Sequence, residues 1–414
     1  MNRTTKRLMA ALGTLFIAAA CNNDVLFHNP TEDPVNPLFT RYVSMGNSIT
    51  AGYQSGGIND STQDQGYPVL LARQMHSPFF VPLLNKPGCT PPIVNVFAGT
   101  VVPGPTVNGC ALLRTQNPPP PYYNNVAVPG AASEDPLSNI APGAGPNPLT
   151  TFFLGGKTQL QAMAAIKPTF VTVWIGNNDV LTAATDTGNA GNPAEITSPA
   201  VFNARYDSIL TAIDATPASG HGVLIGVVDV AAIPYFSYGQ VYFAIKNTTA
   251  NFPPTFIVLP TCAPAALAPG IGVGDTTLVP FRYGATLLAK AQLGIVDTLD
   301  CANDHNITPS ELANIHATVL AYDTHIATVA ASHGYAFLDP NAALAALRAD
   351  TSKVVIFPHF PKTATDTSAG VVQRPFGSAF SRDGVHPSQA TSILIADSLA
   401  SKINAKYGTT LRLA

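Results

Sequence analysis

Val43-Ser44-Met45-Gly46-Asn47-Ser48-Ile49-Thr50-Ala51-Gly52 is the stretch around which the rest of the chain can be interpreted. The apolar residues before Gly46 predict a strand, and Ser48 follows where a helical turn begins. Unpaired backbone N–H groups and the helix dipole at such a point favour the negative charge that develops when a nucleophile reacts. Serine is also a favoured helix N-cap, and on this stretch alone the cap is the better interpretation of Ser48.

Other predicted strands also end in small polar residues. The segment Asn124 to Pro129 predicts a strand that stops at Gly130, and the apolar run Phe170 to Ile175 stops at Gly176-Asn177-Asn178-Asp179. A nearly continuous apolar run is typical of a strand that is buried on both faces of a sheet. Two further strands are predicted at His221 to Val230 and at Tyr335 to Leu338.

Helices alternate with these strands. The clearest one starts at the capping box Thr308-Pro309-Ser310-Glu311, carries one apolar stripe and ends near Gly334. The alternation predicts a parallel sheet with helices on both faces, and ligands of such sheets lie at the carboxyl ends of the strands. The polar stretches at residues 46–48, 130 and 176–179 all fall at those ends, which indicates one shared site.

An aspartate and a histidine near the C-terminus complete this set of residues. In Ser381-Arg382-Asp383-Gly384-Val385-His386-Pro387, one turn can bring the carboxylate of Asp383 to Nδ1 of His386 and leave Nε2 for Ser48. Acyl transfer requires such a serine, activated by a base that a third group orients. Singly, these residues are better explained as turn glycines, capping turns or a surface pair, but the four stretches together favour a catalytic site.

The order of the four stretches resembles the SGNH, or GDSL-like, hydrolase family over roughly residues 40 to 406. The resemblance implies a flavodoxin-like three-layer α/β/α fold whose central parallel sheet has about five strands. It also implies that Ser48 is the nucleophile, that His386 is the base and that Asp383 is its partner. The oxyanion hole would consist of the N–H groups of Ser48 and Gly130 and the amide of Asn178.

The first stretch departs from the family in one residue, because Asn47 replaces the usual aspartate beside the nucleophile. That aspartate is not a member of the triad, so the departure does not exclude activity. The main competitor on chemistry is an α/β-hydrolase, which needs a Gly-x-Ser-x-Gly motif and an acid well before its histidine. It is disfavoured, since Thr50 occupies the position of the second glycine and Asp383 lies only three residues before His386.

Composition and the N-terminus indicate the compartment. The net charge is −3 and only 11% of the residues are charged, so no basic surface for nucleic acid is expected. Basic residues followed by the apolar run Leu8 to Ala20 predict a signal peptide over residues 1–20. The run is too short for a transmembrane helix, which needs ~20 apolar residues. Cys21 then resembles the lipidated cysteine of a bacterial lipobox, although Ala18 occupies the position of the usual leucine. We expect an exported protein that an N-terminal lipid anchors to the bacterial outer membrane, and plain secretion to the periplasm or the cell exterior is the alternative.

The other cysteines are even in number, which in an exported chain predicts disulfides: Cys89, Cys110, Cys262 and Cys301. Their pairing is open. Pairing neighbours in the sequence would close two loop-rich insertions, at about residues 77–123 and 231–307. A zinc site is the rival interpretation, but the sequence has no C-x-x-C and no histidine pair at ligand spacing. Neither a metal nor a cofactor is expected.

The sequence therefore predicts a tether at residues 21–38 and one hydrolase domain at residues 39–408. The predicted activity is serine-dependent hydrolysis of a small-molecule or lipid carboxylic ester. Aromatic residues near the start of the second insertion hint at an acyl-chain substrate, although such a cluster is as often a small separate core. The alternatives are a carbohydrate O-acetyl esterase and a non-catalytic lipoprotein binding module on the same fold.

Overall fold

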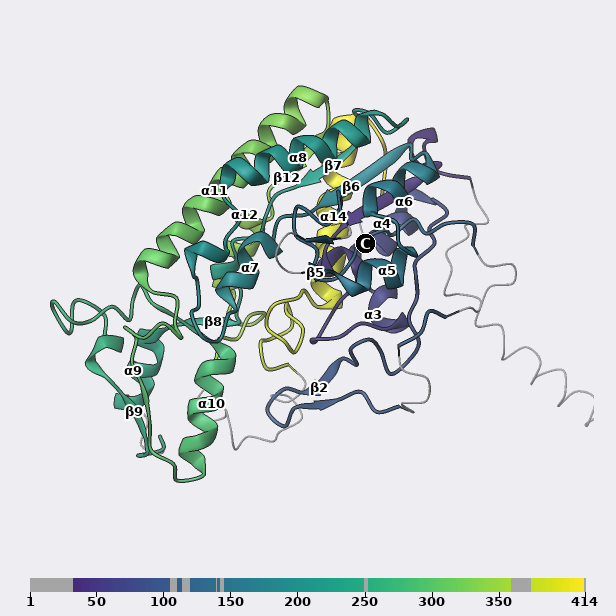
Figure 1. The fold of residues 1–414 in the computed structure, drawn as a ribbon. Coiled ribbons are helices and arrows are strands. Elements are labelled where there is room, and N and C mark those ends of the chain that lie inside the picture. Colours follow the sequence, from purple (N-terminus) through teal and green to yellow (C-terminus); the bar gives the residue numbers. More distant parts are fainter. Residues whose placement is uncertain are drawn as a thin grey trace, which may run out of the picture.

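The structure is a computed structural model that describes residues 33–104, 110–113, 120–138, 140–141, 145–248, 252–358 and 374–412 (Figure 1). The predicted signal peptide and the predicted lipidation site Cys21 lie outside these residues, as does most of the predicted tether.

A parallel sheet forms the middle of the molecule. Its strands are β1 (Tyr42–Gly46), β6 (Phe170–Trp174), β7 (Gly222–Ile225) and β12 (Ala336–Leu338). In the described part of the chain they lie in the order β1-β6-β7-β12, and every neighbouring pair is parallel. All residues of β1, β6 and β7 are buried, which explains their nearly unbroken apolar runs. The strands predicted at these places are confirmed, although β7 ends earlier than the predicted Val230.

The sequence predicts about five strands, and the described residues form four, because segment 124–128 makes an incomplete ladder with β1. The segment is bound to β1 by N–H to C=O hydrogen bonds from Ser44 to Asn124 (3.0 Å), Val126 to Ser44 (2.9 Å) and Val128 to Gly46 (3.1 Å). A regular parallel ladder would also pair the N–H of Gly46 with the C=O of Val126. Instead, Gly46 donates to the side-chain Oε1 of Gln159 at 3.0 Å. With this segment included, the strand order is the flavodoxin-like 2-1-3-4-5.

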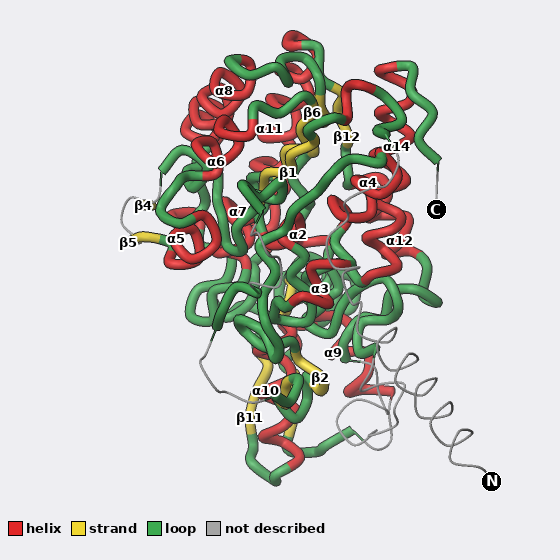
Figure 2. Tube along the Cα trace, turned by 90° about the vertical axis from the view of Figure 1, so that its right-hand side faces the viewer, coloured by secondary structure: helices red, strands yellow, loops and turns green. Residues whose placement is uncertain are grey.

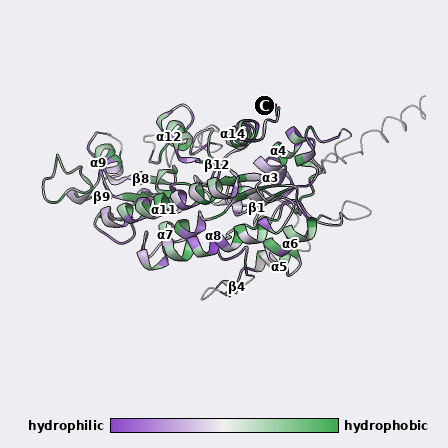
Figure 3. Cartoon of the chain, turned by 90° about the horizontal axis from the view of Figure 1, so that it is seen from above, coloured by the Kyte–Doolittle hydropathy of each residue, from purple (hydrophilic) through white to green (hydrophobic). Residues whose placement is uncertain are grey.

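Helices cover both faces of the sheet, as the view from above shows (Figure 3). The layers are α4 (Tyr67–Met75) and α14 (Gln389–Tyr407) on one face, and α6 (Gln159–Ile166), α8 (Pro199–Asp214) and α11 (Pro309–His333) on the other. Successive side chains of a strand point to opposite faces. Phe170 and Trp174 of β6 therefore pack with α4 and α14, and Val171 and Val173 pack with the other layer. The predicted three-layer architecture is confirmed.

Helix α11 matches its sequence signals at both ends. Thr308 donates its backbone N–H to Oε2 of Glu311 at 2.8 Å, which forms the predicted capping box. At the other end Gly334 takes the left-handed conformation (φ 83°) of a helix C-cap. Its buried residues include Ile315, Tyr322 and others of the predicted stripe.

The remaining elements are short. The helices are η2 (Pro37–Phe39), α2 (Ser48–Ala51), α3 (Asp60–Asp64), α5 (Pro148–Leu154), α7 (Asn178–Ala184), η3 (Pro193–Glu195), η4 (Val230–Ala232), α9 (Gly239–Thr248), η5 (Pro260–Cys262), α10 (Phe281–Gln292) and α12 (Asn341–Ala349). The small strands are β2 (Ile93–Asn95), β3 (Thr100–Val101), β4 (Ile140–Ala141), β5 (Gly145–Pro146), β8 (Phe236–Tyr238), β9 (Phe256–Val258), β10 (Leu278–Pro280) and β11 (Asp297–Leu299). Viewed from the side, α2 lies close to the end of β1 (Figure 2).

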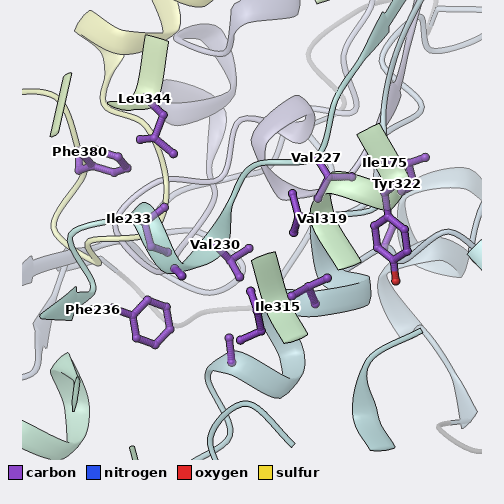
Figure 4. Packing of buried hydrophobic residues seen from close by; sticks show 14 of the residues in the cluster. Ile175, Val227, Val230, Ile233, Phe236, Ile315, Val319, Tyr322, Leu344 and Phe380 are labelled. Atoms are coloured by element: carbon purple, nitrogen blue, oxygen red, sulfur yellow. The ribbon is translucent and has the colours of Figure 1, made fainter. Parts of the chain in front are cut away.

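The aromatic residues of segment 231–307 do not form a core of their own. Phe236, Tyr242 and Phe256 belong to the same buried cluster as the sheet residues Val171 and Val173. Figure 4 shows Phe236 in this cluster, which also contains Ile315 of α11 and Phe380. The alternative of a small separate core is therefore wrong for these aromatic residues.

Two disulfides crosslink the chain. Cys89 is bonded to Cys110 and Cys262 to Cys301, so the pairs are those closest in the sequence. The predicted disulfides are thus present. The sequence left their pairing open, and the structure pairs neighbours in the sequence. Across the described ranges, no helix combines the length and the apolar character that crossing a bilayer requires.

Candidate active site

Ser48, His386 and Asp383 are in direct hydrogen-bond contact although the serine and the histidine are 338 residues apart. Ser48 is the first residue of α2, immediately beyond the end of β1 and nearly buried at 9% exposure. Its Oγ lies 2.9 Å from Nε2 of His386, and Nδ1 of His386 lies 2.8 Å from Oδ2 of Asp383. With Nδ1 donating to the carboxylate, Nε2 is the nitrogen that accepts the serine proton.

Asp383 is held as a carboxylate by its surroundings. Burial acts to raise its pKa, but the charge of His386 and the hydrogen bonds to the carboxylate outweigh burial and hold the pKa at about 2. The donors besides the imidazole are Ser381 Oγ (3.0 Å) and the backbone N–H groups of Gly56 (2.6 Å), Val385 (2.9 Å) and His386 (2.9 Å). The residue 381–387 segment, here called the Asp-His turn, therefore carries an ionised group beside the imidazole.

Gly56 and Tyr53 belong to a loop after α2 that the sequence patterns did not single out. Gly56 supplies one of the donors to Asp383, from a position 327 residues earlier in the chain. The ring of Tyr53 lies 4.9 Å from the imidazole of His386, and its hydroxyl donates to the C=O of Gly56 at 2.6 Å. Burial raises the pKa of Tyr53, and the nearby charge of Asp383 acts in the same direction. The loop therefore contacts both Asp383 and His386, and no motif in the sequence signals this.

Residues 46–48, the nucleophile turn, are held by backbone contacts and a helix cap. A Cβ atom on Gly46 would lie 2.4 Å from the backbone O of Trp174, so only glycine fits there. The side chain of Asn47 caps α2 by accepting the N–H of Ile49 at 3.1 Å. Among the described residues, the Nδ2 of Asn47 has no hydrogen-bond partner although the residue is only 1% exposed. The amide thus performs the capping that an aspartate would perform, but without a charge.

The loop at residues 130–133, the Gly130 loop, is attached to the start of α7. Nδ2 of Asn178 donates to the C=O of Ala131 at 2.8 Å, which leaves the second N–H of that amide for another acceptor. The next helix residue, Asp179, accepts the N–H and the Oγ–H of Ser133 at 2.8 and 2.6 Å. Gly130 is exposed and has φ 81°, a conformation that favours glycine.

The sequence predicts that the backbone N–H groups of Ser48 and Gly130 and the side-chain amide of Asn178 bind an oxyanion. Within the described residues, no acceptor is found for the backbone N–H of Ser48 or of Gly130. The structure thus attaches Asn178 to the Gly130 loop, and the role of these donors stays a prediction.

A largely apolar cavity of about 650 Å³ lies between α12 and α14. Ile49, which follows Ser48, and Val385 and Pro387, which flank His386, form part of its wall. Trp174 and Leu344 also contribute apolar surface. A volume in this range is typical of small-molecule pockets. In the part of the chain that is described, no three His, Cys, Asp or Glu side chains gather in a way that could hold a metal ion.

The protein is thus of the three-layer α/β/α class, and its parallel sheet carries a hydrogen-bonded serine, histidine and aspartate at the carboxyl edge. The chain belongs to the GDSL-like lipase/acylhydrolase family, whose model matches residues 42–399. It is therefore a carboxylic ester hydrolase, and the family predicted from the four sequence stretches is confirmed.

The chain is similar to solved structures of hydrolases from several sources. An acetylxylan esterase from Geobacillus stearothermophilus is 11% identical, with 87% of this chain and 93% of that chain covered and a TM-score of 0.39. An extracellular lipase from Streptomyces rimosus is 16% identical, with 87% and 98% covered and a TM-score of 0.37. An alpha/beta hydrolase enzyme from the metagenome of Lake Arreo, Spain, is 13% identical, with 90% and 98% covered and a TM-score of 0.38. No curated protein matches the chain by sequence.

Proposed function

We propose that the protein hydrolyses carboxylic esters through an acyl-enzyme on Ser48, with His386 as the base and Asp383 as its orienting partner. The observation that carries the proposal is the continuous set of contacts from Asp383 Oδ2 to His386 (2.8 Å) and from His386 to Ser48 Oγ (2.9 Å). An activated serine needs a base in hydrogen-bond contact and a third group that orients the base.

The reaction then has two halves. Ser48 Oγ attacks the ester carbonyl while its proton moves to Nε2 of His386, and the imidazolium returns that proton to the departing alcohol. A water molecule, deprotonated by the same nitrogen, attacks the acyl-enzyme and releases the carboxylic acid. Asp383 stays ionised throughout, consistent with its lowered pKa. The N–H groups of Ser48 and Gly130 and the Nδ2 of Asn178 would bind the oxyanion, each contributing roughly 3 kcal/mol to the transition state.

The substrate class that we favour is an ester with an aliphatic acyl chain. The cavity between α12 and α14 supports this choice: Ser48 and His386 do not line it themselves, but their neighbours in the sequence, Ile49, Val385 and Pro387, form part of its apolar wall. A carbohydrate O-acetyl ester is the second candidate, since the same chemistry needs only a small acyl group. The two candidate substrates predict different dependences of the hydrolysis rate on the length of the acyl chain.

The compartment is also a proposal. The two disulfides favour an exported protein, since such bonds persist in oxidising compartments. We further propose that residues 1–20 are a signal peptide, that Cys21 carries a lipid, that residues 21–38 are a tether, and that residues 39–408 form one hydrolase domain. Mass spectrometry of the mature protein tests the lipid directly, and an unmodified N-terminus at another residue would overturn it.

The test of the activity is hydrolysis of nitrophenyl esters of increasing acyl length by the wild type and by Ser48→Ala. We expect kcat of the variant to fall by about 10⁶, as in other serine triads. A maximum at medium or long chains supports the acyl-chain substrate, and activity confined to acetyl esters supports the carbohydrate ester. If the wild type hydrolyses no ester, including acetylated sugars, the binding module replaces the enzyme.

A further inference from the structure

Gln159 is a fully buried side chain in contact with the nucleophile turn, and it lies outside every motif described above. It is the first residue of α6 and is 0% exposed. The N–H of Gly46 donates to its Oε1 at 3.0 Å, and its Nε2 donates to the C=O of Gly46 at 3.0 Å. We propose that Gln159 is a positioning residue that fixes Ser48 for the hydrolysis, an inference that rests on the proposed function.

The contact between Gln159 and Gly46 replaces one hydrogen bond of the sheet. It does so where the nucleophile turn and the segment that leads to the Gly130 loop separate. The N–H of Gly46 would pair with Val126 in a regular ladder, but Gln159 occupies that position. The carbonyl of Gly46 still accepts the N–H of Val128 at 3.1 Å, just before the chain reaches Gly130. Gln159 therefore contacts the backbone where the nucleophile turn and the segment leading to the Gly130 loop diverge.

Gly46 depends on such backbone contacts because it has no side chain with which to pack. A Cβ there would lie 2.4 Å from the backbone O of Trp174 and 2.5 Å from Oγ1 of Thr50. Gln159 is itself held in place by the α6 cap, in which Thr158 and Gln161 exchange hydrogen bonds of 3.0 and 3.1 Å. A buried amide is costly unless both of its polar ends are paired, and here both are paired with one residue.

Substitution by methionine separates this role from packing. Gln159→Met keeps the length and approximate volume of the side chain but removes both hydrogen bonds to Gly46. We expect kcat for a soluble nitrophenyl ester to fall by about 10- to 100-fold while KM changes by less than about twofold, because a small displacement of a nucleophile affects the chemical step most.

Gln63 provides a matched control. It is 2% exposed and also pairs both ends of its amide with backbone: Nε2 donates to the C=O of Pro82 at 2.9 Å, and Oε1 accepts the N–H of Leu84 at 2.8 Å. Gln63→Met therefore removes the same kind of interaction away from the backbone of Gly46. We expect it to lower the melting temperature about as much as Gln159→Met and to leave kcat within about twofold of the wild type.

A third variant, Gln159→Glu, gives a pH signature that a packing role would not give. A protonated carboxyl has one donor and one acceptor, like the amide, whereas the ionised form can only accept. We expect the ratio of its kcat to that of the wild type to rise as pH falls, because protonation restores a donor for the C=O of Gly46. The corresponding ratio for Gln159→Met stays constant with pH.

The outcomes separate the inference from the proposed function. The positioning role is supported if kcat falls in Gln159→Met but not in Gln63→Met. It is also supported if the ratio of the Gln159→Glu kcat to the wild-type kcat rises as pH falls. Equal kcat in Gln159→Met and Gln63→Met overturns it while the function stands, provided that Ser48→Ala is inactive. Undiminished hydrolysis by Ser48→Ala overturns the function, and the inference with it.

Discussion

The Asp-His turn and the Gly130 loop each depend on one aspartate, Asp383 (side chain 12% exposed) and Asp179 (2% exposed), and the two pKa values are shifted in opposite directions. Burial acts to raise both. Asp383 accepts hydrogen bonds from the imidazole and from four other donors, and its pKa is about 2. Asp179 accepts two hydrogen bonds from Ser133, and burial raises its pKa. The pKa of such a carboxyl group thus depends on whether its hydrogen-bond donors and the neighbouring charges outweigh burial.

The difference assigns different roles to the two aspartates. Asp383 provides a stable negative charge next to a group that becomes positive during the proposed reaction. Asp179 connects α7 with the Gly130 loop, beside the contact between Asn178 and Ala131. Three measurements test this comparison, and a fourth tests the nucleophile turn, which has an amide in place of an aspartate.

The largest effect is expected for Asp383→Asn. An amide keeps the shape of the carboxylate but cannot hold the imidazole in the same tautomer or stabilise its positive form, so kcat should fall by about 10⁴. The measurement is the steady-state rate with a soluble nitrophenyl ester, and circular dichroism shows whether the fold is kept. A decrease of less than tenfold would contradict the role given to Asp383.

A smaller loss is expected for Asp179→Asn. The amide can accept only part of the hydrogen bonding from Ser133, so the Gly130 loop loses its fixed position and kcat should fall by about 10- to 100-fold with little change in KM. Asp135→Asn is the control, since Asp135 binds the N–H of Ala132 at 2.7 Å within the same stretch without bridging to α7. Equal effects of the two variants would show that the bridge to α7 has no special importance.

The two aspartates should also give opposite pH dependences of stability. The pKa of Asp383 is about 2 in the folded protein, against ~3.9 in an unfolded chain. Its carboxylate therefore stabilises the fold above about pH 4, and this contribution of roughly 2–3 kcal/mol is lost as pH falls from about 4 to about 2. The raised pKa of Asp179 has the opposite sign, because its ionised form is disfavoured by folding and protonation on acidification relieves that cost.

Melting temperatures from pH 7 to pH 2.5 test this pair of signs. The stability of the wild type relative to Asp383→Asn should decrease as pH falls below 4. Relative to Asp179→Asn, the wild type should become more stable over the acidic range. Parallel curves for the two variants would show that the carboxylates do not differ in the way described.

The smallest effect is expected for Asn47→Ala in the nucleophile turn, which contains neither aspartate. The substitution removes the cap on the N–H of Ile49 and should lower the free energy of unfolding by about 1 kcal/mol. Asn47→Asp keeps a capping oxygen and should restore the capping part of that loss. Urea unfolding of both variants measures the difference, and no loss in Asn47→Ala would mean that α2 does not need its cap.

The sequence predicted those parts of the molecule whose structure depends on residues close to one another in the chain. The apolar run of β6 and the capping box of α11 are local patterns, and both elements form where the patterns indicate. The four polar stretches follow strands or lie in one turn, so their order alone was enough to indicate a shared site and a family. The short spacing of Asp383 and His386 likewise anticipated their contact.

The tertiary structure alone decided those contacts between distant residues that no motif in the sequence signals. Gly56 donates to Asp383 from 327 residues away, and Gln159 reaches Gly46 from 113 residues away. Neither belongs to a periodic or spaced pattern, because such a pair becomes close only after the whole chain has packed. The same reason explains why the described residues form four strands of this sheet and not five: the apolar character of segment 124–128 is local, but its ladder with β1 is interrupted by the side chain of Gln159.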